Sequence, residues 1–157
     1  MQKLLFISLL FLSAQAMAQS KFSKHEFSIN GFRNPSVGLE YRYKSVSVHA
    51  GYYPTIISQD ENDKGLTTSF LRTGLSLWFL PIGKKENPSS FYASASYLRG
   101  FDREYKDENA AMLEAGFRWM IWKGLNVRIG AAVLMAKDRP TYLNPTPGIS
   151  YSFFSKN

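Results

Sequence analysis

The chain has no cysteine among its 157 residues. Disulfide bridges, a thiol nucleophile and cysteine-ligated zinc or iron–sulfur sites are therefore excluded. It also has no run of about 18 consecutive apolar residues, the length that a membrane-spanning helix requires. It is not poor in apolar residues overall, because 45% of the sequence is hydrophobic and 15% is aromatic, which excludes a disordered chain. The length suits one domain.

The first 18 residues have the composition of an export signal. Lys3 precedes an apolar core over residues 4–12, and Ala16-Met17-Ala18 supplies the small-residue pattern of a cleavage site. We predict that residues 1–18 are a cleaved signal peptide and that residues 19–157 form the mature domain. Export of a chain without cysteine favours a bacterial envelope over a secreted, disulfide-rich scaffold.

Apolar and polar residues alternate through most of the remaining chain, as residues 37–44 and 125–131 show clearly. A period of two predicts β-strands with two chemically different faces, and no helical period competes with it. Eight such runs are present, at about 25–32, 36–44, 46–53, 68–80, 90–99, 110–122, 125–136 and 147–154.

The connections between these runs differ in length. The pairs 44–45 and 123–124 are two-residue hairpin turns, whereas residues 54–67, 100–109 and 137–146 form long polar loops. With an even number of antiparallel strands, both termini and the tight turns lie at one end and the long loops at the other. The pattern predicts an all-β fold, an eight-stranded antiparallel up-and-down transmembrane β-barrel.

The charged residues indicate which face of the strands points inward. The predicted strands carry no lysine in their middle, and their mid-strand charges all share the polar face with a row of glycines. These charges are Glu26, Glu40, Arg42, Arg72, Glu114, Arg118 and Arg128. Arginine forms rigid, forked pairs with carboxylates, which suits a confined interior.

An eight-stranded barrel is just wide enough for side chains to fill it. We therefore predict a plugged lumen in which six of these charges form one network. Its members are Glu40, Arg42, Arg72, Glu114, Arg118 and Arg128.

The opposite face carries no charge and is rich in aromatic residues. Tyr43, Phe79, Trp119 and Trp122 fall toward the tight-turn end. A second set, expected near the other end, comprises Tyr52, Tyr53, Phe91, Tyr97 and Phe101. Rings at two such levels are typical of the interfacial girdles of a membrane barrel.

The last predicted strand contains Gly148 followed by Tyr151 and Phe153 at alternate positions. With these residues, the stretch 25–154 resembles the small eight-stranded outer-membrane barrels of the OmpA/OmpX type, whose last strand usually carries such an assembly signal. Here Ser155-Lys156-Asn157 follow, where that family usually stops. The Phe-, Tyr- and Lys-rich composition is similar to that of barrels from the Bacteroidota.

The resemblance implies a location in the bacterial outer membrane, contact with outer-membrane lipid and lipopolysaccharide, and recognition by the barrel-assembly machinery. The formal net charge of +7 does not imply a nucleic-acid partner. Lysines gather at the tight-turn end and acids in the long loops, and no basic stripe is interleaved with aromatic residues.

The sequence offers little chemistry. Residues 60–65 are rich in acids, but Lys64 and Leu71 occupy positions where a calcium loop needs ligands. His25 and His49 lack the spacing of a metal site. Ser47 and His49 share the polar face of one strand, with Glu40 on its neighbour, which is the beginning of an acyl-transfer triad.

We predict a barrel that is porin-like in architecture but has no catalysis, no metal and no cofactor. Its expected role is structural, or an interaction at the cell surface or within a larger envelope complex. Two alternatives stay open. One is a lipid-modifying enzyme of the lipid A acylase or deacylase kind that uses Ser47, His49 and Glu40. The other is a soluble periplasmic barrel that binds an apolar ligand.

Overall fold

A computed structural model describes residues 22–32, 36–59, 65–83 and 85–155 of the chain. The predicted signal peptide, residues 1–18, and the acidic stretch 60–64 lie outside the described residues. The strands are β1 (His25–Gly31), β2 (Val37–Tyr43), β3 (Val46–Gln59), β4 (Gly65–Ile82), β5 (Ser89–Gly100), β6 (Asn109–Trp122), β7 (Leu125–Ala136), β8 (Tyr142–Pro145) and β9 (Gly148–Phe154). A short 3-10 helix, η1 (Arg103–Tyr105), joins β5 to β6. Across the described ranges, no helix has the length and apolarity needed to cross a membrane.

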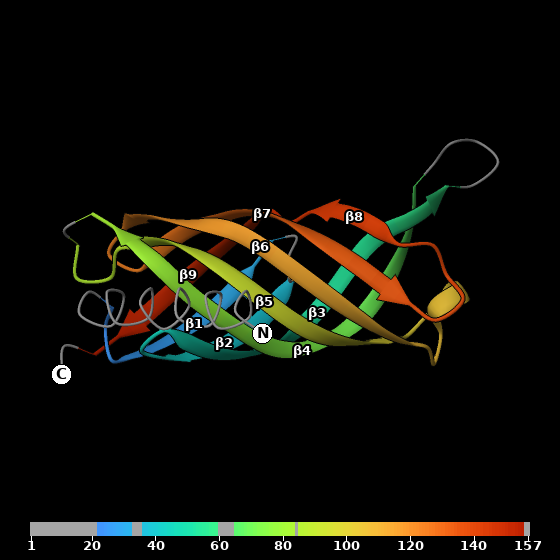
Figure 1. The fold of residues 1–157 in the computed structure, drawn as a ribbon, viewed down its shortest axis with the longest axis horizontal. Coiled ribbons are helices and arrows are strands. Elements are labelled where there is room, and N and C mark those ends of the chain that lie inside the picture. Colours follow the sequence, from blue (N-terminus) through green and yellow to red (C-terminus); the bar gives the residue numbers. More distant parts are fainter. Residues whose placement is uncertain (1–21, 33–35, 60–64, 84, 156–157) are drawn as a thin grey trace, which may run out of the picture.

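The last two strands are halves of one strand. Both pair with β7 in a single register, with Pro145 opposite Ala131 and Gly148 opposite Arg128. β8 ends at Pro145 and β9 begins at Gly148, so residues 146–147 form a short interruption between the two halves. Since β9 also pairs with β1, the sheet closes into an eight-stranded antiparallel barrel, as Figure 1 shows. The predicted all-β antiparallel architecture is confirmed.

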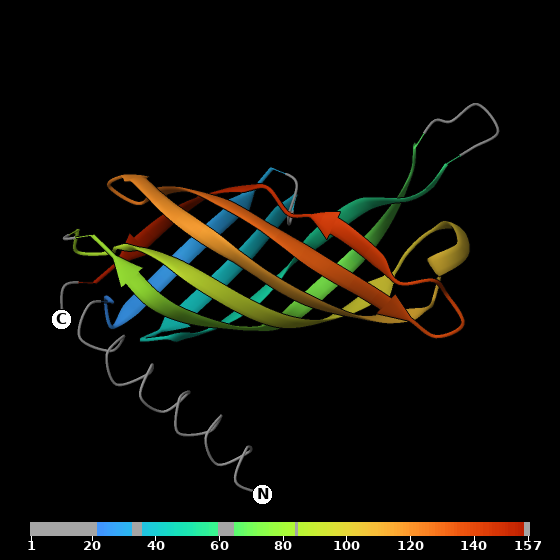
Figure 2. The same cartoon turned by 45° about the horizontal axis from the view of Figure 1, so that its top comes forward.

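The barrel closes with a stagger. The outward-facing partners form one continuous row around the wall. In order, these are Phe153, Phe27, Tyr41, Val48, Leu75, Ala95, Leu113, Val133 and Leu143. The row therefore ends on the strand where it began, ten residues before Phe153. A stagger of this kind requires strands that are inclined to the barrel axis, as they are in Figure 2.

The wall is not equally tall all round. β1 and β2 have 7 residues each, whereas β3 has 14 and β4 has 18. The predicted loop 54–67 is wrong for this reason: the ladder continues through β-branched pairs such as Thr55 with Thr68 and Ile56 with Thr67. Part of the predicted loop 137–146 likewise forms β8. The tight turns lie at one end of the barrel, here called the turn end, and η1 lies at the opposite, loop end (Figure 1).

Most aromatic residues of the girdle prediction lie on the outer face, but two need correction. Tyr53 is only 2% exposed and points into the lumen, because the strand alternates and its neighbour Tyr52 faces outward. Phe91 belongs to the turn end, where its ring stacks on Phe79 at a centroid distance of 6.3 Å. Phe91 lies near the start of β5, and β5 starts at the turn end. The ring therefore belongs to the turn-end set and not to the set expected at the other end.

Candidate functional site: two zones of the lumen

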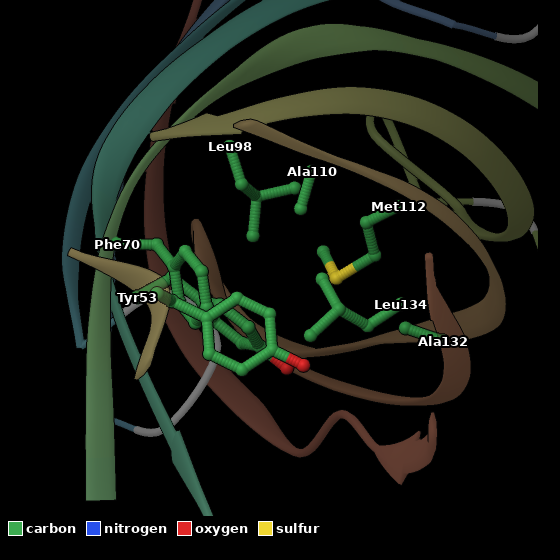
Figure 3. Close-up of a cluster of buried hydrophobic side chains, with 8 residues drawn as sticks. Tyr53, Phe70, Leu98, Ala110, Met112, Ala132 and Leu134 are labelled. Carbon is green, nitrogen blue, oxygen red and sulfur yellow. The ribbon is translucent and has the colours of Figure 1, made fainter. Parts of the chain in front are cut away.

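The interior of the barrel divides into two zones along its axis. The charged zone consists of Glu26, Glu40, Arg42, Arg72, Glu114, Arg118 and Arg128, all of which are buried. The apolar zone lies toward the loop end and consists of Tyr53, Phe70, Leu98, Tyr105, Ala110, Met112, Ala132 and Leu134. Figure 3 shows the side chains of the apolar zone converging inside the wall.

Glu26 on β1 lies at the centre of the first ion-pair cluster. Arg118 donates from Nη1 to Glu26 Oε1 at 2.7 Å, and Arg42 donates from Nε to Glu26 Oε2 at 2.9 Å. Asn87 completes the cluster, since its Nδ2 donates to Glu26 Oε2 at 2.6 Å and its Oδ1 accepts from Arg42 at 2.8 Å. Both carboxylate oxygens are thus occupied by charged or amide donors, which compensates their burial.

Glu40 on β2 forms the second cluster. Its Oε2 accepts from Arg128 Nη1 at 2.7 Å, and its Oε1 accepts from the Ser47 hydroxyl at 2.5 Å. Glu114 on β6 forms the third. Arg72 Nη2 donates to Glu114 Oε2 at 2.7 Å, and the Tyr92 hydroxyl donates to Oε1 at 2.7 Å.

Two aromatic rings join these clusters. The guanidinium groups of Arg118 and Arg128 lie 4.4 and 5.0 Å from the Trp78 ring centroid, and Arg128 also lies 6.0 Å from that of Tyr92. Contacts of this kind are attractive, most of all when they are desolvated. Gly116 provides the room for Tyr92, because a Cβ at this position would meet the Tyr92 hydroxyl at 2.7 Å.

The structure therefore brings all six residues of the predicted network into one zone. They form ion-pair clusters that share aromatic rings, with Glu26 as the acid between two arginines. Sequence reasoning missed Asn87, because it lies in a connection where alternation assigns no face. The side chains fill this zone closely: a cavity between Glu40, Arg72, Glu114 and Arg128 measures about 20 Å³.

The acyl-transfer residues do not form a triad. Ser47 donates to Glu40 and accepts from Trp78 Nε1 at 2.8 Å. The two ring nitrogens of His49 instead lie 3.2 Å from the Ser76 hydroxyl and 3.0 Å from the Ser96 hydroxyl. Nucleophilic catalysis requires a hydrogen bond between the hydroxyl and its base, and the described contacts of Ser47 do not include His49.

The apolar zone packs through aromatic and aliphatic contacts. The Phe70 ring lies 6.4 Å from that of Tyr53 and meets the Tyr105 ring edge-on at 5.4 Å. Leu98, Met112 and Leu134 are almost fully buried beside them (Figure 3). The sequence does hold a signal for this zone, since these aliphatic residues share the inward face with the charged ones.

The residues of the predicted assembly signal lie on the strand that closes the barrel. Gly148 is buried, whereas Tyr151 and Phe153 face outward with their ring centroids 5.0 Å apart. Their role in assembly stays a prediction.

Within the described ranges, no group of three or more His, Asp and Glu side chains is placed to hold a metal ion. Comparisons of the chain with protein-family models, with curated proteins and with solved structures found no match.

Proposed function

We propose that the protein is an integral outer-membrane β-barrel with a plugged lumen, in a structural or surface-interaction role without catalysis. The observation that carries this proposal is the inverted distribution of polarity across the wall. Large apolar side chains are exposed around the outer face, whereas the ion pairs are buried inside.

The exposed apolar side chains form what we call the apolar belt. It includes Phe27, Ile29, Leu39, Tyr41, Val48, Leu71, Leu75, Tyr97, Leu113, Trp119, Ile129, Leu143, Ile149, Tyr151 and Phe153. In water, each such side chain would forgo part of the roughly 1.5–3 kcal/mol that full burial provides, and lipid restores that part. A soluble barrel places its apolar face inside instead. The outward-facing belt therefore favours a membrane barrel over a periplasmic ligand-binding barrel.

A charged pair at the loop end also supports a membrane location. Arg99 lies on the outer face beyond Tyr97 and pairs with the exposed Asp107 at 3.0 Å. A charged pair at this level suits the water-facing side of an aromatic girdle. Because outer-membrane barrels have short periplasmic turns and longer extracellular loops, the long loops would face the cell exterior and the tight turns the periplasm.

The close packing of the charged zone supports a plugged lumen. The described contacts of Ser47, which do not include His49, favour a non-catalytic role over lipid modification. The proposed partners are outer-membrane lipid and lipopolysaccharide, together with the barrel-assembly machinery, which would read Gly148, Tyr151 and Phe153. A larger envelope complex is the proposed setting for an interaction role.

Cell fractionation tests the proposal. We expect the protein in the outer-membrane fraction, resistant to extraction with urea or carbonate, and with different gel mobility before and after boiling. Recovery in the soluble periplasmic fraction would contradict membrane insertion. A change in the mass of lipid A upon deletion of the gene would contradict the non-catalytic role.

A further inference from the structure

Among the described strands, the barrel wall is lower beside the apolar zone, because β1 and β2 end before β3 does. The last pairing between β2 and β3 joins Val37 to Tyr52, and the last pairing between β1 and β9 joins Gly31 to Ile149. Toward the loop end of these pairs, β3 and β8 have a strand neighbour on one side only among the described strands. We call the line between residues 53–56 of β3 and residues 142–145 of β8 the seam.

A cavity of about 130 Å³ lies in the seam. Its lining comprises Tyr53, Pro54, Thr55, Ile56, Asn144 and Pro145. Tyr53 belongs both to this lining and to the apolar zone, so the cavity borders the buried apolar side chains. On the outside, Leu143 is 72% exposed and Ile56 is 44% exposed, so the approach from lipid is apolar as well.

The β3 edge of the seam is rich in hydrogen-bond acceptors. The carbonyl of Tyr52 accepts from Ser36 at 2.9 Å, on the side of β3 that faces away from β4. Because backbone groups alternate along a strand, Pro54 and Ile56 direct theirs to that same side, into the seam. Pro54 contributes a carbonyl but no N–H.

The β8 edge repeats this arrangement. The N–H of Thr146 donates to the Gly130 carbonyl of β7 at 2.9 Å, so the alternate residues Pro145 and Leu143 direct their backbone groups away from β7 and into the seam. Pro145 again has no N–H. Four residues thus direct backbone groups into the seam: Pro54, Ile56, Leu143 and Pro145. Each supplies a carbonyl, but of these four only Ile56 and Leu143 supply an N–H.

We propose that the seam binds one hydrocarbon chain of an amphiphile that carries a hydrogen-bond donor, a hydroxyl or an amide N–H, next to the chain. The donor pairs with the seam carbonyls, and the chain enters the apolar zone. This proposal rests on the proposed membrane location, because lipid supplies the amphiphile. An added β-strand fits less well, since the two prolines remove N–H groups that such a strand would need. A carboxylate finds fewer partners, because it brings only acceptors and can pair only with the N–H groups of Ile56 and Leu143 and with Nδ2 of Asn144.

The test uses a long-chain alcohol with a photoreactive diazirine at its terminal carbon. The barrel, isolated from membranes, is reconstituted in phosphatidylcholine vesicles with this probe, irradiated, and mapped by peptide mass spectrometry. We expect adducts on the lumenal residues Leu98, Met112 and Leu134 as well as on the belt residues Leu113 and Ile129. The methyl ether of the same alcohol should give about fivefold less lumenal adduct, the ratio that one net hydrogen bond provides.

A double variant tests the role of the two prolines. Pro54→Val with Pro145→Val restores both N–H groups and allows the two edges to pair, so lumenal adducts should fall by about fivefold while belt adducts stay unchanged. Pro81→Val, in β4 at the turn end, is the matched control and should change neither. Boiling-dependent gel mobility checks that each variant is folded.

The possible failures are distinguishable. Belt adducts without lumenal adducts would overturn the seam proposal and leave the membrane location standing. Equal lumenal labelling by the alcohol and its ether would overturn the need for a donor. Lack of adducts on belt and lumen alike would overturn both the seam and the membrane location.

Discussion

The charged zone and the apolar zone occupy the same lumen but differ in the wall around them. The charged zone draws its residues from strands that include β1 and β2, where the wall is closed by all eight strands. The described residues of the apolar zone come from β3 to β7 and from η1, and Tyr142 of β8 packs against them. The seam lies beside this second zone.

The two zones place different requirements on the wall around them. A buried carboxylate needs several donors with correct geometry, and Glu26 obtains them from β2, β6 and the connection before β5. Such convergence requires a closed wall that fixes every donor. Apolar packing has no directional requirement, so it tolerates a wall with a seam. We therefore expect the charged zone to be more sensitive to single substitutions than the apolar zone.

The largest effect is expected at Glu26. Glu26→Ala leaves both Arg42 and Arg118 without their carboxylate, and breaking a buried ion pair costs about 3–5 kcal/mol even for one partner. We expect at least this loss in the free energy of unfolding, measured by urea titration in vesicles. The exposed pair provides the control: Asp107→Ala should change stability by less than about 1 kcal/mol. Equal effects of the two substitutions would remove the distinction between buried and exposed pairs.

A somewhat smaller effect is expected at Glu114. Glu114→Ala removes the carboxylate that Arg72 and Tyr92 share. We expect the free energy of unfolding to fall by about 3 kcal/mol, measured as a lower unfolding temperature in detergent. Glu114→Gln keeps an oxygen that accepts a hydrogen bond and should lose less. If neither Glu114→Ala nor Glu40→Ala lowers the unfolding temperature, the ion pairs do not hold the barrel rigid.

The apolar zone should respond less. Leu134→Ala removes buried methyl groups beside Met112, and we expect a loss of about 2–3 kcal/mol, the lower part of the usual range, because the seam lets neighbours relax. Met112→Leu conserves volume and should cost less than about 1.5 kcal/mol. Urea titration under the same conditions as for Glu26→Ala checks the ranking. A loss at Leu134 larger than that at Glu26 would reverse the comparison between the zones.

Much of this arrangement was predictable from the sequence, because period-two alternation directly reports which residues share a face. It placed Glu40, Arg118 and Arg128 in the lumen with Trp78, and Leu75 on the outside. What it does not report is how strands are offset from one another. The height of the wall depends on the stagger that closes the barrel, which is a property of all the pairings together.

The features that the sequence did not predict depend on strand offsets or on connections, which alternation does not report. The seam and the apolar zone arise where β1 and β2 stop while β3 continues, and nothing local in residues 54–67 marks that difference. Tyr53 was misplaced because an aromatic residue near a strand end suits either face. Asn87 was missed because its role depends on a connection that returns over the lumen to reach Glu26.

If the apolar belt faces lipid, the cost of an introduced charge should depend on its depth in the membrane. Leu75→Arg places a guanidinium in the belt, whereas Thr67→Arg places one on the outer face of the same strand near the loop end. In vesicles, we predict that Leu75→Arg lowers the free energy of unfolding by about 2–4 kcal/mol and Thr67→Arg by no more than about 1 kcal/mol. Equal, small effects of both substitutions would contradict the account, because they would mean that water covers both positions.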